Sequence, residues 1–168
     1  MRYSAILRGW LKGLAMVTTL VAQAGAARAD VGDRAALAGT FLDGTPFDIA
    51  RDRGKVVIVD FWATWCTPCV AEMPMLDEFA RAHAGKVVLI GVSEDQQDAM
   101  DNVRAAMVPL HYPTATLYGL TANSFGHPHV LPVAFIVGGD GVLGAVVRAS
   151  DKPLTADDLQ AIVALLLK

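Results

Sequence analysis

The chain has 168 residues, of which 54% are hydrophobic and 18% are charged, and its formal net charge is −3. This length suits one domain with a real hydrophobic core. The apolar content excludes an intrinsically disordered chain.

The first part of the chain has the pattern of an export signal. Three basic residues lie within residues 1–12, residues 14–24 are mostly apolar, and Ala27-Arg28-Ala29 has the small-x-small form that signal peptidase reads. We therefore predict a signal peptide over residues 1–29, cleaved after Ala29. The folded domain, residues 30–168, is then expected outside the cytoplasm.

An uncleaved membrane anchor is the alternative for this leader. The uncharged stretch, residues 13–27, has 15 residues, whereas about 20 are needed to span a bilayer. Without residues 1–29 the chain has 10 basic residues against 17 acidic ones, a formal charge of −7. Since binding to nucleic acid would call for a basic patch, no nucleic-acid partner is expected.

The first half of the domain alternates between predicted strands and helices. Residues 41–47 suggest a small hairpin with Asp43-Gly44 at its turn. Residues 55–63 form an apolar run typical of a buried central strand. A helix over 67–84, a second buried strand over 87–92 and a helix over 95–107, expected on the opposite side, follow. Alternation of this kind predicts an α/β fold with parallel pairing and right-handed crossovers.

The second half gives weaker signals until its end. Residues 111–118 suggest a short edge strand, and 121–125 a helical turn. Residues 132–137 and 142–147 read as two strands joined by a glycine-rich hairpin link. A final helix begins at Thr155, with Asp158 placed three residues later, close to a capping box.

The only two cysteines, Cys66 and Cys69, lie between the predicted central strand and the helix. A bridge between them would close a short loop and stabilise little, so a purely structural role explains them poorly. Strand, CxxC and helix together indicate a dithiol for thiol–disulfide exchange. Structural zinc is disfavoured because no second Cys/His pair stands at motif spacing. No metal and no separate cofactor are expected beside the redox-active pair.

The expected mechanism gives the two sulfurs different roles. Cys66, at the start of the helix, is favoured as a thiolate by unpaired N–H groups and the helix dipole, and would attack a partner disulfide. Cys69, one turn later, would displace the reduced product. Pro68 supplies no N–H and sets φ in the first turn.

Two carboxylates could handle the proton of Cys69. Asp60 lies in the predicted central strand, where burial would raise its pKa and suit it to general-base work; the alternative is an Asp at the exposed end of the strand. Glu72 stands three residues after Cys69, on its side of the helix. It could accept a proton or tune the thiols, or it could be a solvated glutamate that complements the dipole.

Two further features carry alternatives. Pro132 opens a strand after Leu131 and could place a backbone edge beside the dithiol if the bond were cis, although the base rate favours trans. His127 and His129 could join the thiols in a copper site, because sulfur and imidazole suit that metal. Surface histidines are the simpler interpretation, since their spacing fits no defensible motif.

The run Val59-Asp60-Phe61-Trp62-Ala63-Thr64-Trp65-Cys66-Thr67-Pro68-Cys69 resembles the thioredoxin superfamily. With Glu72-Met73-Pro74 it is similar to the exported TlpA/ResA-like branch, whose active site reads WCxPCxxExP. The resemblance covers roughly residues 41–168. It implies a thioredoxin-like fold: a central mixed sheet flanked by helices, with an N-terminal β-hairpin extension.

The resemblance also implies roles for individual residues. Cys66 becomes the nucleophile, Cys69 the resolving thiol and Pro132 the cis-proline beside them. Glu72 matches the glutamate of the branch, and Asp60 matches the buried aspartate of classical thioredoxins, where this branch often has Asn. Carrying both acids is a departure that leaves open which one takes the proton. Client contacts are expected at the residues that flank the cysteines and the proline: Trp65, Thr67, Pro68 and Leu131.

As a member of this branch the protein would be a periplasmic thiol:disulfide oxidoreductase, most simply a reductase for particular protein clients. Electrons would come from a membrane thiol carrier of the DsbD/CcdA type. Clients in the branch include apocytochrome c and copper-site assembly proteins, and a monomer is expected. An oxidant and a non-enzymatic copper-binding protein, using Cys66, Cys69 and His127 or His129, are the competing hypotheses.

Overall fold

The computed structural model describes residues 28–148 and 153–167. The predicted signal peptide, apart from Arg28 and Ala29, lies outside these residues. Within them, no helix combines the length and apolar character that crossing a bilayer demands.

One mixed sheet of seven strands forms the centre of the domain, in the order β2-β1-β5-β4-β3-β6-β7. Strands β3 and β4 pair in parallel, as do β4 and β5, and the other pairs are antiparallel. The α/β class, the mixed sheet and the N-terminal hairpin that the sequence predicts are confirmed. The strands are β1 (Leu37–Phe41), β2 (Pro46–Asp48), β3 (Val56–Trp62), β4 (Val87–Ser93), β5 (Thr114–Asn123), β6 (Val133–Val137) and β7 (Leu143–Arg148).

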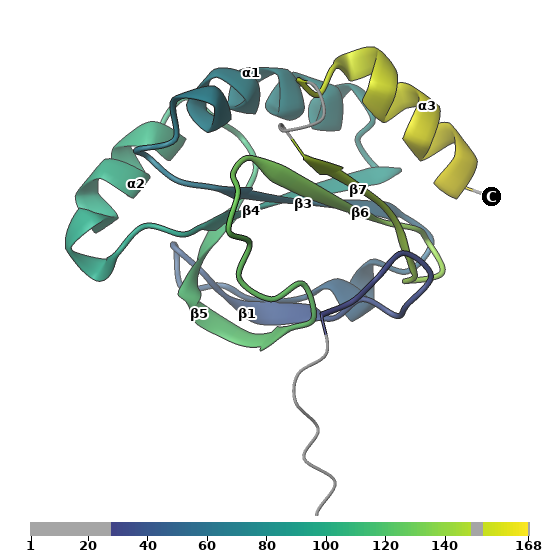
Figure 1. Cartoon of the computed structure of the whole chain (residues 1–168), viewed down its shortest axis with the longest axis horizontal. Helices are drawn as coiled ribbons and strands as arrows, with labels where there is room; N and C mark the ends of the chain where they lie inside the picture. Colours follow the sequence, from purple (N-terminus) through teal and green to yellow (C-terminus); the bar gives the residue numbers. More distant parts are fainter. Residues whose placement is uncertain (1–27, 149–152, 168) are drawn as a thin grey trace, which may run out of the picture.

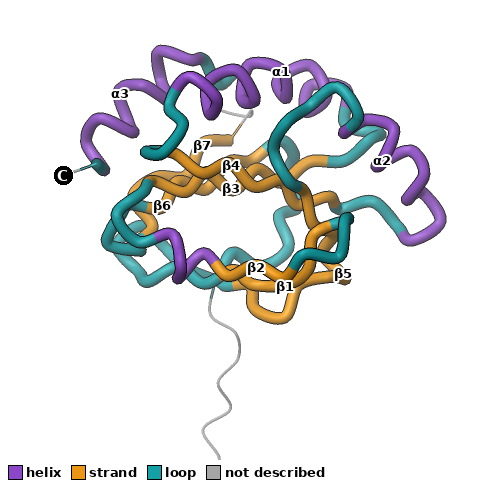
Figure 2. Tube along the Cα trace, turned by 180° about the vertical axis from the view of Figure 1, so that it is seen from behind, coloured by secondary structure: helices purple, strands orange, loops and turns teal. Residues whose placement is uncertain are grey.

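Figures 1 and 2 show the three α-helices over one face of β3, β4, β6 and β7, with the hairpin of β1 and β2 folded below the opposite face. The helices are α1 (Thr67–Ala82), α2 (Met100–Met107) and α3 (Ala156–Leu166), and two short 3-10 helices are η1 (Ile49–Asp52) and η2 (Gln97–Ala99). The expectation that the helix before residue 107 lies opposite α1 was wrong. Its buried Val103 packs in the same hydrophobic cluster as Met73 and Leu76 of α1.

Each face of the sheet buries its own hydrophobic cluster. All seven residues of β3 are buried, because alternate side chains point to opposite faces and both faces are covered. Ile58 and Trp62 point to the helices, whereas Val59 and Phe61 point to the hairpin side. There Phe61 meets Phe125 and Phe135 edge-on, and the rings of Phe125 and Phe135 are tilted against each other.

Strand β5 is longer and more central than expected. It continues as far as Asn123, so residues 121–123 are strand, where a helical turn was predicted over 121–125. It lies inside the sheet and is not an edge strand. Its first residues pair with β4 and the remainder pairs with β1. The hairpin therefore continues the sheet and folds under the face opposite α1, α2 and α3 (Figure 2).

Two element ends show how local hydrogen bonds set boundaries. The helix expected from residue 95 begins only at Met100, after η2, because Asp95 uses its carboxylate to accept bonds from Ser93 and Thr64. The capping box at α3 is confirmed: Thr155 Oγ1 accepts from Asp158 N–H, and the Asp158 carboxylate accepts from Thr155 N–H.

Replacing Gly39 by alanine is expected to lower the free energy of unfolding by about 1–3 kcal/mol. A Cβ at this position would lie 2.4 Å from the carbonyl oxygen of Gly119 and 2.9 Å from Cα of Leu120. Both are backbone atoms of β5, so no side-chain rotation relieves the clash. Urea unfolding measures the effect. Thr40→Ala, at the exposed neighbouring position, should stay within about 0.5 kcal/mol of wild type; an equal loss in both variants would contradict this explanation.

Candidate active site

The two cysteines form a disulfide at the N-terminal end of α1. Their Cα atoms are 5.3 Å apart. Cys66 is the N-cap residue, and its sulfur accepts from the N–H of Cys69 at 3.3 Å. Cys66 is 6% exposed and Cys69 1%, so Cys66 presents the sulfur that a partner can reach. The helix N-terminus, where N–H groups and the dipole favour negative charge, is the place expected for an attacking thiolate.

The loop before α1 exposes an indole beside the disulfide. Trp65 is 68% exposed, whereas Trp62 is fully buried and donates from Nε1 to Thr114 Oγ1 at 3.1 Å. Thr67 and Pro68 are exposed in the first turn of the helix. Trp65 is thus placed to meet a partner, and Trp62 is a core residue.

Asp60 lies within the core beneath the site. It points to the helix side of β3, because its neighbours two positions away, Ile58 and Trp62, belong to the cluster that contains both cysteines. The side chain is almost inaccessible, and Oδ1 finds no hydrogen-bond partner in the part of the chain that the structure describes. Burial, with a contribution from the charge of Glu72, raises the pKa of Asp60 to about 8.

Glu72 is half-buried and lines a groove beside the disulfide. Burial raises the pKa of this carboxyl to about 7. Both acids are therefore poised to change protonation near neutral pH, as acids and bases in catalysis must. The negative charge of Glu72 contributes to the raised pKa of Asp60, which places the two carboxyls within electrostatic range of each other.

The Leu131–Pro132 peptide bond is cis, as the family resemblance implies and against the base-rate expectation. Pro132 faces Pro68 and Glu72 across the groove, which has a volume of about 500 Å³. Leu131, half-buried, precedes it, and Val130 is exposed. The groove therefore receives side chains from α1, from the loop before β6 and from the segment before α3: Pro68, Ala71, Glu72, Met75, Pro132, Pro153 and Leu154.

The two histidines of the alternative copper hypothesis contact Glu94 and each other. His127 Nε2 lies 3.1 Å from Glu94 Oε2, and the rings of His127 and His129 stack at 6.4 Å. Across residues 28–148 and 153–167, no three His, Cys, Asp or Glu side chains are placed to hold a metal ion. The arrangement gives the copper hypothesis no support.

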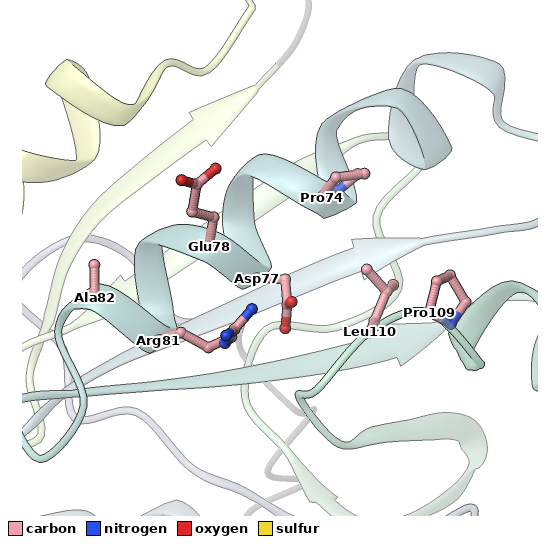
Figure 3. Close-up of a pocket in the computed structure, with 7 residues that line it drawn as sticks. All are labelled: Pro74, Asp77, Glu78, Arg81, Ala82, Pro109 and Leu110. Atoms are coloured by element: carbon pink, nitrogen blue, oxygen red, sulfur yellow. The ribbon is translucent and has the colours of Figure 1, made fainter.

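A second pocket, of about 630 Å³, lies further along α1 and does not include the disulfide (Figure 3). In Figure 3 Asp77 and Arg81 lie on the side of the helix that faces Leu110, and Glu78 points away from it. The Asp77 carboxylate accepts from the backbone N–H of His111 and lies 2.9 Å from its Nδ1. This contact joins the middle of α1 to the segment before β5.

Sequence reasoning missed several residues at the site. Tyr112 is buried in the cluster with the cysteines, and its hydroxyl has no partner among the described residues. Burial, together with the charges of Asp60, Asp77 and Glu72, raises its pKa. Glu94 and Asp95 were also missed. One signal could have found the two acids: they directly follow a buried parallel strand, and such strand ends gather at the functional edge of a sheet.

Comparison with known proteins shows the family to which this fold and site belong. The model of the family described as Thioredoxin-like matches residues 54–143, which include the disulfide, Asp60, Glu72 and Pro132. The chain belongs to the thioredoxin-like family. The thiol-disulfide oxidoreductase ResA of Bacillus thuringiensis is 30% identical over 103 residues, which are 61% of this chain and 60% of that protein.

Solved structures agree with this thioredoxin-like assignment. A thiol:disulfide interchange protein of the thioredoxin family from Chlorobium tepidum has a TM-score of 0.67 and 25% identity, over 84% of this chain and 100% of that one. A secreted disulfide oxidoreductase of Mycobacterium tuberculosis, described as homologous to E. coli DsbE, has a TM-score of 0.61 and 25% identity, over 77% and 95%. These relatives support the ResA-like branch. The chain spans about half to three fifths of the length of the curated relatives it matches.

Proposed function

We propose that this protein is a periplasmic thiol:disulfide oxidoreductase that reduces disulfides in particular protein clients. The observation that carries the proposal is the Cys66–Cys69 disulfide at the N-terminus of α1, beside a groove that Pro132 helps to line and above the buried Asp60. The names of the ResA and DsbE-type relatives support the reaction class.

The reaction begins from the dithiol. The Cys66 thiolate attacks one sulfur of the client disulfide, a Cys66–client bond forms, and the other client sulfur leaves as a thiolate. Cys69 then loses its proton to a carboxylate and attacks the sulfur of Cys66. The second client sulfur leaves, two electrons have passed to the client, and the Cys66–Cys69 bridge described here is the product.

Two carboxylates are available for the proton of Cys69. Asp60, with a pKa near 8, has no access to solvent, whereas Glu72, with a pKa near 7, borders the groove. We assign the first acceptance of the proton to Asp60 and its exchange with solvent to Glu72. Their electrostatic coupling fits this sequence, because ionisation of one disfavours ionisation of the other.

The cellular setting is part of the proposal and is supported by the family resemblance. The protein is proposed to be exported by its first 29 residues, either released or anchored, and to act as a monomer. A membrane thiol carrier of the DsbD/CcdA type would reduce the disulfide again. Clients in cytochrome c maturation or in copper-site assembly of respiratory oxidases are proposed, and the secreted relative supports export.

The reduction potential separates a reductant from an oxidant. We expect a value near that of thioredoxin, about −270 mV, rather than near that of DsbA, about −120 mV. The protein is equilibrated with dithiothreitol or glutathione couples, and the reduced fraction is followed by alkylation and by the fluorescence of Trp65. A potential near the DsbA value would reject the reductase and support the oxidant.

A further inference from the structure

The end of β4 contacts both loops that form the active site. Ser93 is the last residue of the strand and pairs with Trp62 of β3. The N–H of the next residue, Glu94, donates to the carbonyl of Trp62 at 2.9 Å. Residues 94 and 95 are therefore fixed by backbone at the edge where the CxxC segment begins.

Asp95 holds the loop that leads to the cysteines. Its carboxylate accepts from Thr64 N–H at 2.9 Å and from Thr64 Oγ1 at 2.6 Å. Ser93 Oγ donates to the same carboxylate at 2.9 Å. Asp95 is buried, and hydrogen bonds to a buried carboxylate are strong and directional. Thr64, two residues before Cys66, is thereby tied to the end of β4.

Glu94 holds the loop that leads to Pro132. Its Oε2 lies 3.1 Å from Nε2 of His127, five residues before the proline. The glutamate side chain is 5% exposed, and its Oε1 is without a partner within the described ranges. His127 is thus the contact that compensates a nearly buried carboxylate. Two residues before His127, the same loop is anchored by Phe125, which is fully buried in the hydrophobic cluster on the hairpin side of the sheet.

These contacts bear on the groove, because the groove is lined from both sides of the site. Pro68 and Glu72 come from the helix that the CxxC loop starts, and Pro132 comes from the loop that His127 anchors. A shift of one loop against the other would change the width of the groove. It would leave the Cys66–Cys69 geometry intact, because both cysteines belong to the CxxC loop and the start of α1.

We propose that the Glu94–His127 pair is a positioning element for client recognition: it fixes the Pro132 loop at the distance from the CxxC loop that a bound polypeptide requires. The inference rests on the proposed function and extends it. A client that lies in the groove depends on the pair, whereas a small disulfide that only meets Cys66 does not.

His127→Ala tests the inference; because it removes the partner of a nearly buried carboxylate, its urea unfolding midpoint is measured beside that of wild type to show that the variant is folded in the assay. Reduced protein is reacted with a disulfide-linked peptide dimer and, separately, with the small disulfide DTNB. We expect kcat/KM for the peptide to fall about fivefold to tenfold through KM, while the DTNB rate and the reduction potential stay within about twofold of wild type. Glu94→Ala, which removes the hydrogen-bond acceptor, should give the same selective loss, and the double variant should lose no more than either single one.

His111→Ala is the matched control. The His111–Asp77 pair has the same chemistry at 2.9 Å, with similar exposure, but joins α1 to the segment before β5. It should leave both rates unchanged. Equal losses with peptide and DTNB in His127→Ala, or no loss with either, would overturn the positioning role. A wild-type protein that reacts with neither disulfide would instead refute the proposed function.

Discussion

The Cys69→Ser variant is expected to remain covalently attached to its client through Cys66. Cys66 is the more exposed sulfur and caps α1, so its attack on a client disulfide does not need Cys69. Release does need it, because only the second sulfur is placed to displace the client. Turnover should therefore fall to background while a mixed disulfide accumulates.

Non-reducing electrophoresis and mass spectrometry of the purified variant measure the adduct. Cys66→Ser is the matched control and should form none, because Cys69 is 1% exposed. Absence of any adduct in Cys69→Ser, together with no reduction of insulin disulfides by the wild type, would refute the exchange mechanism. Weak insulin reduction alone would not, since a reductase for particular clients can ignore insulin.

The second large effect concerns the two acids beside the disulfide, Asp60 and Glu72. Asp60→Asn should slow release of the client by about 10²–10⁴-fold, the usual contribution of a general base. In the wild type the rate of this step should rise with pH through the range 7–8, where Glu72 and Asp60 ionise. In Asp60→Asn the part of the rise near pH 8 should be lost, because that part belongs to the ionisation of Asp60. Stopped-flow measurement of mixed-disulfide resolution between pH 5 and 10 gives the profile.

Glu72→Gln is expected to act differently from Asp60→Asn. Glu72 borders the groove, where water can replace it, so the loss of rate should be smaller. Its negative charge also raises the pKa of Asp60, so its removal should move the pH profile to lower pH. A profile that moves to higher pH, or one that Asp60→Asn leaves unchanged, would contradict the assignment of the proton to Asp60.

The same burial predicts how stability depends on pH. Because the pKa of Asp60 is about 8 in the folded protein and 3.8 in the reference state, the folded form keeps a proton that the unfolded chain releases. The contribution is fully present below about pH 4 and is lost as pH rises through about 8; the total is roughly 6 kcal/mol at 1.36 kcal/mol per pKa unit. Urea unfolding of the oxidised protein at pH 5, 7 and 9 should show this decline relative to Asp60→Asn, and parallel curves would refute it.

Local signals made the centre of the fold predictable. The apolar run of β3, the CxxC pair and the spacing of α1 are contiguous in sequence, and the structure reproduces them within a few residues. The capping box at Thr155 was equally readable, because its partners are three residues apart. The cis form of Pro132 followed from family resemblance and could not follow from the properties of one proline.

Contacts between residues far apart in the sequence account for the features that the sequence did not predict. Strand β5 is half-exposed and rich in threonine, and its role depends on β1, some 75 residues earlier in the chain. The bonds from Asp95 to Thr64 and from Glu94 to His127 join residues 31 and 33 positions apart. No periodicity reports such contacts, so the partners of Glu94 and Asp95 emerged only from the structure.

The outermost strand on the hairpin side, β2, has three residues and begins with Pro46. A terminal strand offers free N–H and C=O groups as a template for another polypeptide, and a proline removes one donor from that template. A short edge strand therefore offers few backbone groups with which another extended polypeptide can pair. In its proposed function the protein can thus meet extended polypeptides at its reactive groove without adding them to this edge of its sheet.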